Sequence, residues 1–153
     1  MMDELRELYQ EVILDHGKNP RNHHALADAT HDAVGHNAMC GDSLHLYLIY
    51  QDGRVLDASF KGQGCAISLA SASLMTEILK GKTKADIDQL HQAFHLLATG
   101  DETASVPAHL EEDFERLSVL AGVRAFPMRV KCATLAWHTQ EAALNGQGEA
   151  SSE

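Results

Sequence analysis

The sequence has few basic side chains, few cysteines and no long apolar run. Twelve Lys and Arg stand against 22 Asp and Glu, which gives a formal net charge of -10. Nucleic-acid binding needs Lys and Arg to neutralise phosphates, and anionic membrane surfaces attract the same residues. The composition therefore argues against both as partners. No apolar stretch approaches the roughly 18 residues of a membrane span, and the charged start of the chain lacks the apolar core of a signal peptide.

The chain has three cysteines in 153 residues. An odd number of cysteines without a secretory signal favours a reducing compartment, where thiols act as ligands or nucleophiles. We therefore expect a cytoplasmic protein without disulfides. At this length, one domain can bury a core without such bridges.

Two short apolar runs, residues 43–50 and 54–60, predict β-strands. Asp52 and Gly53 lie between them, and an Asp-Gly pair at this place is a strong hairpin signal. A third short strand near residues 33–34 is only weakly marked. We therefore expect a small antiparallel sheet of about three strands.

Later in the chain, apolar residues recur at spacings of three and four, which predicts helices. Strands grouped early and helices grouped later indicate an α+β fold, with the sheet packed against about five α-helices. The expected single domain covers 1–144, followed by a mobile tail at 145–153. The predicted helices cover 3–16, then 67–78, 87–97 and 110–121, which Gly81, Gly100 and Gly122 end, and finally the stretch from Pro127 to about Leu144.

Each cysteine lies in a motif that favours an available sulfur over a buried one. Cys40 precedes Gly41 and Asp42, and the glycine lets the chain turn so that thiol and carboxylate converge. Cys65 follows a Gly-x-Gly segment at the expected start of a helix, where partial positive charge lowers a thiol pKa. Cys132 lies in the first turns of the last helix. These motifs favour sulfur chemistry, metal chemistry or both.

The hairpin brings two of these motifs together. Antiparallel partners begin and end at the same end of a sheet, so Cys40 and Cys65 can be neighbours. With Asp42 and Cys132, they make three thiolates and one carboxylate, a complete tetrahedral set for zinc. The cysteine spacing is not that of a regular zinc finger. Composition alone leaves open that each cysteine is a small buried hydrophobic residue.

The sequence also contains ten histidines. His91 and His95 are one helical turn apart and could hold a metal, but no further ligand is evident nearby, so we expect a solvated helix face. His138 follows Cys132 by six residues, about 240° round an ideal helix, and should not join its ligand set.

These motifs resemble the iron–sulfur cluster assembly scaffold family of the IscU/NifU N-terminal type, and most of all its SufU branch. The blocks Gly-Gln-Gly-Cys-Ala-Ile-Ser around Cys65 and Lys-Cys-Ala-Thr-Leu-Ala-Trp around Cys132 are specific. Lys131 stands where IscU-type members carry a histidine, and the long stretch between the second and third cysteines is similar to the SufU insertion. Ala38 departs from the family's usual proline. The matching segments are 8–16, 18–22, 37–42, 60–73 and 129–137.

The resemblance implies a SufE/NifU-like fold and a zinc-dependent sulfurtransferase. Cys40, Asp42, Cys65 and Cys132 would bind Zn²⁺. Cys40 would be the catalytic residue, accepting persulfide sulfur from a PLP-dependent cysteine desulfurase of the SufS type.

Further residues would support the site or guide docking, namely Gly41, Gly64, Arg129 and Lys131. The alternative is a scaffold on which iron or a [2Fe–2S] cluster is assembled and passed to downstream carrier proteins. A third possibility is a purely structural zinc domain. The sequence leaves the oligomeric state open.

Overall fold

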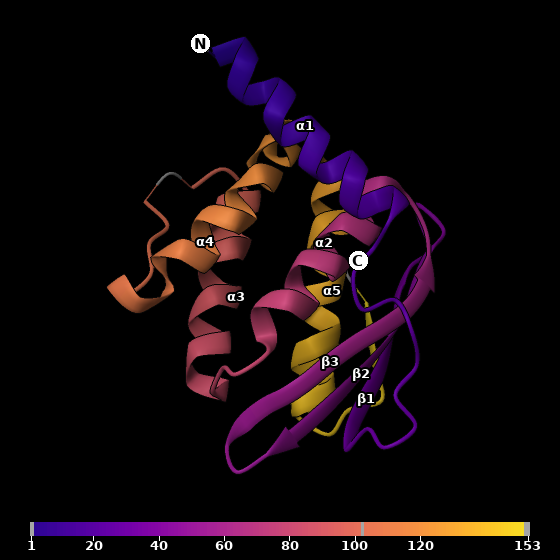
Figure 1. The fold of residues 1–153 in the computed structure, drawn as a ribbon. Coiled ribbons are helices and arrows are strands. Elements are labelled where there is room, and N and C mark those ends of the chain that lie inside the picture. Colours follow the sequence, from indigo (N-terminus) through magenta and orange to yellow (C-terminus); the bar gives the residue numbers. More distant parts are fainter. Residues whose placement is uncertain (1, 102, 152–153) are drawn as a thin grey trace.

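The computed structural model describes residues 2–101 and 103–151, with side chains from residue 10 onward. None of the helices in this part of the chain has both the length and the apolar content of a membrane-spanning segment. The elements in order are α1 (Met2–Lys18), β1 (His31–Asn37), β2 (Asp42–Gln51), β3 (Arg54–Gln63), α2 (Ala66–Leu79), α3 (Lys84–Ala98), the 3₁₀ turn η1 (Ala108–Leu110), α4 (Glu111–Leu117), the 3₁₀ segment η2 (Ser118–Ala125), α5 (Pro127–Leu144) and β4 (Glu149–Ser151) (Figure 1).

The first three strands form an antiparallel meander with β2 in the middle. The chain turns between β2 and β3 at Asp52 and Gly53, whose φ angles are 55° and 79°. A two-residue type I′ turn requires left-handed backbone at both positions, and the Asp-Gly pair supplies it. The predicted hairpin is confirmed. The weakly marked strand is β1, which pairs with β2 from His31 opposite Leu48 to Asn37 opposite Asp42.

The α+β class is confirmed, but the sheet has one more strand than predicted. β4 pairs parallel with β1, so the order is β3-β2-β1-β4 and the sheet is mixed. Within the predicted mobile tail over 145–153, Glu149–Ser151 form this strand, while 152–153 lie outside the described residues. The chain reverses at Gly146 (φ 76°), and Val34 then donates its N–H to the Gly148 carbonyl at 2.9 Å. Pairing with β4 satisfies backbone groups along the edge of β1.

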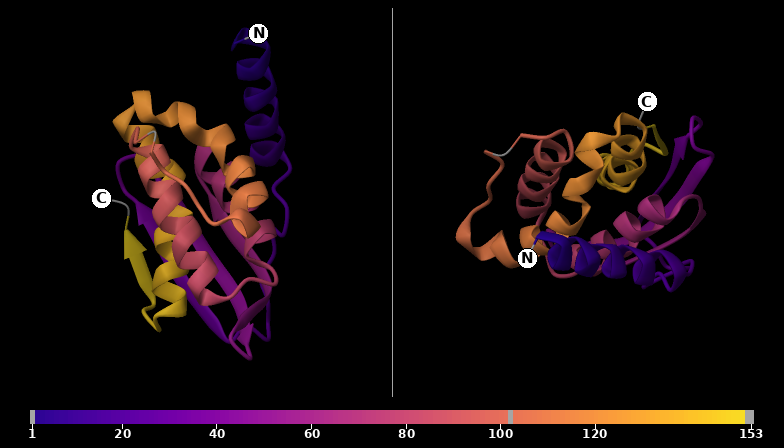
Figure 2. Two further views of the ribbon diagram at one scale, coloured as in Figure 1. Left: turned by 90° about the vertical axis from the view of Figure 1, so that its left-hand side faces the viewer. Right: turned by 90° about the horizontal axis from the view of Figure 1, so that it is seen from above.

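The helices cover one face of the sheet (Figure 2). α5 packs on β1 and β2, α2 packs on β3, α1 lies against α2, and α3 lies against α5. Leu44, Leu46 and Leu48 alternate along β2 and are buried, as expected when one sheet face meets the core. The same core cluster holds Phe60 and Trp137, both fully buried. The helix that carries Cys132 is thereby fixed against the sheet.

The predicted helix over 110–121 is shorter than expected. α4 ends at Leu117, and the chain continues as the 3₁₀ segment η2 through Gly122, the predicted stop. Leu117, Leu120 and Val123 are buried, and they lie three residues apart. Because a 3₁₀ helix has three residues per turn, this spacing places all three side chains on one face. The other predicted helices are confirmed within a few residues at their ends.

His91 does not lie on a solvated face, which corrects the prediction for that residue. Its side chain packs between α3 and α5, 5.9 Å from the Trp137 ring, and the residue is only 7% exposed. Burial, together with the nearby His138 and His95, lowers the pKa of His91 to about 4. His95 is exposed, as predicted. The imidazole of His91 is therefore neutral at neutral pH.

This burial predicts a loss of stability in mild acid. The unfolded chain takes up a proton at His91 near its ordinary pKa of 6.5, whereas the folded protein resists it down to about 4. The free energy of unfolding should therefore fall as the pH drops through this window, by up to about 3 kcal/mol from this group. Urea denaturation of the wild type and His91→Gln between pH 7 and 4 measures it. Identical pH slopes for the two proteins would contradict the assignment, and His24→Gln, an exposed histidine, serves as the control.

Candidate metal centre

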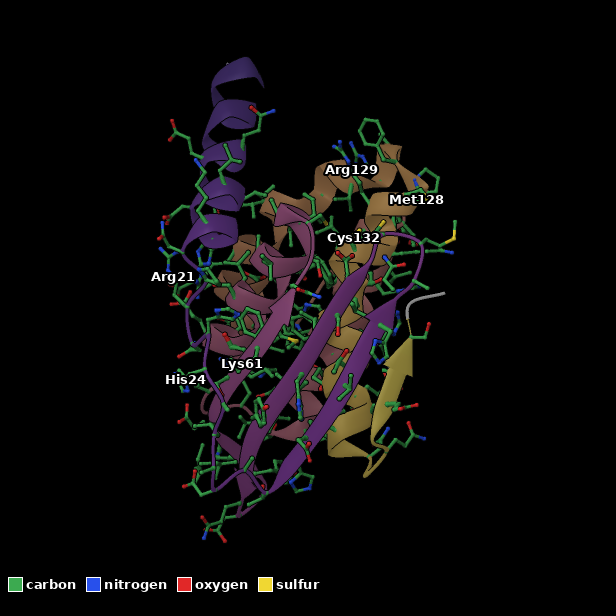
Figure 3. The ribbon with its side chains drawn as sticks, turned by 90° about the vertical axis from the view of Figure 1, so that its right-hand side faces the viewer. Arg21, His24, Lys61, Met128, Arg129 and Cys132 are labelled. Atoms are coloured by element: carbon green, nitrogen blue, oxygen red, sulfur yellow. The ribbon has the colours of Figure 1, made fainter. Side chains whose placement is uncertain are left out.

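All four predicted ligands lie around one end of the sheet. Asn37, the last residue of β1, faces Asp42, the first of β2, and the turn between them carries Cys40. Cys65 caps the N-terminus of α2, directly after β3. Cys132 lies in the second turn of α5, where Figure 3 shows it beside this sheet end. The antiparallel hairpin and the helix α5 thus bring distant segments to one place.

Three of the four predicted ligands form a compact group. Ligand atoms of Cys40, Asp42 and Cys132 all lie within 4.8 Å of one another. Asp42 and Cys132 are each 2% exposed, whereas Cys40 is half-buried. Within this group, Cys40 is therefore the sulfur that another molecule can reach.

Cys65 lies at the margin of the group and is exposed. Its backbone N–H donates to Asp42 Oδ1 at 2.9 Å, and its sulfur accepts from the Ser68 N–H at 3.4 Å. Its side chain also interacts with Cys132. Cys65 therefore lies beside Cys132 and Asp42 but outside the compact group of three.

The crowding of acceptor atoms shapes the electrostatics of the site. Burial raises the pKa of the Cys132 thiol, and hydrogen bonds with Asp42, Cys40 and Cys65 raise it further. Thiolates packed beside a buried carboxylate require a positive charge among them. The donor set of sulfurs and one carboxylate oxygen fits Zn²⁺, which binds such ligands tetrahedrally. The residues present therefore fit a zinc ion.

Asn37 is a site residue that the sequence analysis missed. It is fully buried, and its side-chain amide donates to Asp42 Oδ2 at 3.3 Å and lies 3.6 Å from the Cys132 sulfur. The side-chain NH₂ group of Asn37 therefore contacts two predicted ligands, and such contacts orient the ligands of a metal site. Asn37 opens the same turn as Cys40, but its contact with Cys132 spans 95 residues.

The two predicted glycines act in different ways. Gly41 has a φ of 71° and open space around it, so its role is the turn itself. Gly64 lies against Asp42, and a Cβ at this position would collide with the carboxylate Oδ1. Glycine at this position therefore lets the chain pass close enough for the Cys65 N–H to reach Asp42.

The predicted cations lie outside the group of ligands. Arg129 lies over the Phe126 ring, 4.7 Å from its centre, and is exposed near the start of α5 (Figure 3). Lys131 is half-exposed. Among the described residues, neither forms an ion pair with Asp42. Their roles stay predictions.

Comparison with known proteins places the chain in a family. The model of the NifU-like N-terminal domain matches residues 8–133, so the chain belongs to the NifU-like N-terminal domain family. One relative, the iron–sulfur cluster assembly scaffold protein IscU of Streptococcus pyogenes serotype M1, is 35% identical over 149 residues, covering 97% of this chain and 90% of that protein. Another, the zinc-dependent sulfurtransferase SufU of Bacillus subtilis (strain 168), is 39% identical over 137 residues, covering 90% and 89%.

Solved structures agree on the fold. A protein from Fervidobacterium islandicum AW-1, described as a candidate iron–sulfur cluster assembly scaffold for the SUF system (FiSufU), matches with a TM-score of 0.78 and 33% identity, covering 88% of this chain and 94% of that one. The N-terminal part of a NifU-like protein from Brucella abortus matches with a TM-score of 0.79 over 90% and 92% of the two chains. At 24% identity, the second likeness concerns the fold alone.

The close approach of Gly64 predicts a marked effect of one methyl group. Gly64→Ala should lower the free energy of unfolding by about 1–3 kcal/mol, because Asp42 must move away from the new Cβ. Gly122→Ala is the matched control, since a Cβ there meets nothing within 4 Å. Urea denaturation measures both. Equal stability of the two variants would show that Asp42 does not need this close approach.

Proposed function

We propose that this protein is a zinc-dependent sulfurtransferase of iron–sulfur cluster biogenesis. Cys40 accepts persulfide sulfur from a PLP-dependent cysteine desulfurase of the SufS type, in the cytoplasm. Zinc is held by Cys40, Asp42, Cys65 and Cys132. The observation that carries the proposal is the compact group in which two ligands are buried and Cys40 is half-exposed.

Three further observations support the proposal. A zinc ion with three thiolates and one carboxylate carries a net charge of about -2, which the cations of Arg129 and Lys131 at the start of α5 can offset. Lys131 also stands where IscU-type members carry a histidine, by the resemblance described above. The relative named as a zinc-dependent sulfurtransferase is 39% identical over 90% of this chain.

The bound zinc would stabilise the thiolate forms of its sulfur ligands. The Cys40 thiolate then attacks the outer sulfur of the persulfide on the desulfurase cysteine. A sulfur–sulfur bond forms on Cys40, the original sulfur–sulfur bond breaks, and the desulfurase cysteine leaves as a thiolate. No external oxidant or reductant is consumed.

The other residues hold the geometry during this exchange. The Cys65 N–H and the Asn37 amide fix the two oxygens of the Asp42 carboxylate. Cys132 is anchored on α5, whose following turns are buried against the sheet. The turn around Gly41, which carries Cys40, is exposed, so we expect the movement needed for sulfur transfer to occur there.

The proposed acceptor role predicts a specific loss of activity. Cys40→Ser should abolish the acceleration of a SufS-type desulfurase, measured as alanine released per minute, because serine cannot hold a persulfide. Met39→Leu is the matched control, since it changes an exposed side chain beside Cys40 without removing a thiol. Thermal melts of the same samples separate transfer from a purely structural zinc site. Full acceleration by Cys40→Ser would disprove the acceptor role.

The proposed zinc site predicts metal content and a role for Asn37. Protein purified without chelator should contain about one zinc per chain and no visible chromophore. Asn37→Leu should weaken zinc binding by about 10- to 100-fold, because Asp42 and Cys132 lose their amide donor. Competition with a chromophoric chelator measures the affinity, and His24→Gln is the control. Unchanged affinity in Asn37→Leu would refute this role.

The second candidate function is a scaffold that assembles a [2Fe–2S] cluster as cargo. It is favoured by the relative named as an IscU scaffold, which covers 97% of this chain, and by the thiolate ligands that such clusters use. A brown protein with acid-labile sulfide and little zinc would favour this alternative in the same elemental analysis.

A further inference from the structure

Three histidines meet at the contact between α3 and α5, away from the thiol group. His91 and His95 are one turn apart on α3, and His138 lies opposite on α5. The ring centres of His91 and His138 are 5.4 Å apart, and those of His95 and His138 are 6.0 Å apart. Both pairs meet edge to face. His138 follows Cys132 by six residues, a rise of about 9 Å along an α-helix.

A carboxylate on α5 orients the buried member of this group. Glu141 lies one turn after His138, and its Oε2 is 3.1 Å from His91 Nδ1. The side-chain amide nitrogen of Gln140 lies 3.3 Å from the same His91 nitrogen. In the neutral tautomer that carries its proton on Nδ1, His91 donates to the Glu141 carboxylate. The tautomer then leaves the Nε2 lone pair of His91 free, which is the arrangement of carboxylate–histidine–metal triads.

The protonation state also suits a ligand role. Burial lowers the pKa of His138, and His95 nearby lowers it further. With the pKa of His91 at about 4, the two inner imidazoles are both unprotonated at neutral pH. Their lone pairs are then available without displacing a proton.

The ring separations are close to those of a shared ligand sphere. Two imidazoles on one tetrahedral ion, with metal–nitrogen distances of about 2.0–2.1 Å, have ring centres about 5 Å apart. Among the described residues, only the thiol group has ligand atoms that all lie within 4.8 Å of one another, so the histidine group is open. Closing it takes side-chain rotation of His95, which is exposed, and of His138, which is half-buried.

A hollow opens beside the buried histidine of this group. A hollow of about 250 Å³ between α3 and α5 reaches the side chains of His91 and Glu141. Lys84, at its rim, is held by Asn145, to whose Oδ1 its ammonium donates at 2.9 Å. The hollow therefore opens His91 and Glu141 to solvent, whereas His95 and His138 do not line it.

We propose that His91, His95 and His138 form a second metal site, which binds a divalent transition ion such as Zn²⁺, Co²⁺ or Ni²⁺. Imidazole nitrogens select these borderline ions over Mg²⁺ and Ca²⁺, which prefer oxygen ligands. Glu141 acts as a positioning residue for His91. A bound ion ties α3 to α5, the helix that carries Cys132.

Co²⁺ is the probe, because thiolate ligands give it strong near-ultraviolet charge-transfer bands that imidazole ligands do not. Wild type and Cys40→Ser are titrated with Co²⁺, and bound cobalt is counted after equilibrium dialysis. We expect one cobalt per chain without sulfur bands in both proteins, together with a rise in melting temperature. Cobalt bound at the thiol group shows sulfur bands, whereas cobalt bound by the histidines does not. The same titration therefore tests the histidine site independently of the zinc site in the proposed function.

Variants of the more accessible histidines locate the ion. His95→Gln and His138→Gln should each lower the affinity for the cobalt that shows no sulfur bands at least tenfold. Each should also abolish the rise in melting temperature on cobalt binding. His24→Gln should change neither the affinity nor the melting temperature. His24 lies on the segment before β1, far along the chain from α3 and α5, and its ring nitrogen Nδ1 lies 3.1 Å from the Ala25 carbonyl (Figure 3). The proposal is overturned if every bound cobalt shows sulfur bands, or if the other cobalt survives in both cluster variants. His95 is exposed, so its variant remains informative if His138→Gln fails to fold.

Discussion

The buried carboxylate of Asp42 joins three segments at one end of the sheet. One oxygen accepts from the N–H of Cys65 at the start of α2, and the other accepts from the Asn37 amide at the end of β1. Burying a carboxylate is costly unless donors or a cation compensate. These two hydrogen bonds offset part of that cost and fix the carboxylate beside Cys40 and Cys132, where it forms a group of possible ligands. The positions of the turn, of α2 and of Gly64 all follow from this arrangement.

Much of this arrangement could be predicted because its signals are local. Asp52-Gly53 predicted the hairpin, and hairpin geometry predicted that Cys40 and Cys65 approach each other. The contribution of Asn37 could not be predicted, since its amide reaches Cys132 across 95 residues and only the packed position of α5 brings them together. β4 has three residues and no periodic pattern, so its pairing with β1 was equally hidden.

His91 shows a different limit of sequence patterns. One turn of helix separates it from the exposed His95, and a local pattern treats the two alike. Packing distinguishes them, since His91 is buried against the Trp137 ring of α5, whereas His95 stays exposed although it also contacts His138. The same limit applies to the end of α4 and to η2. The three-residue spacing of Leu117, Leu120 and Val123 favours a 3₁₀ segment because all three side chains are buried in the core. In both cases, a partner segment far along the chain decides the outcome.

The edges of the sheet carry a consequence for how other proteins can approach. β4 lies along β1, while on the outer side of β3 the N–H groups of Val55 and Phe60 donate to the carbonyls of Lys82 and Asn22. Recognition by β-augmentation, in which a visitor extends the sheet with its own strand, would have to displace these segments. At the outer edge of β3, a visiting strand therefore competes with segments of the chain itself.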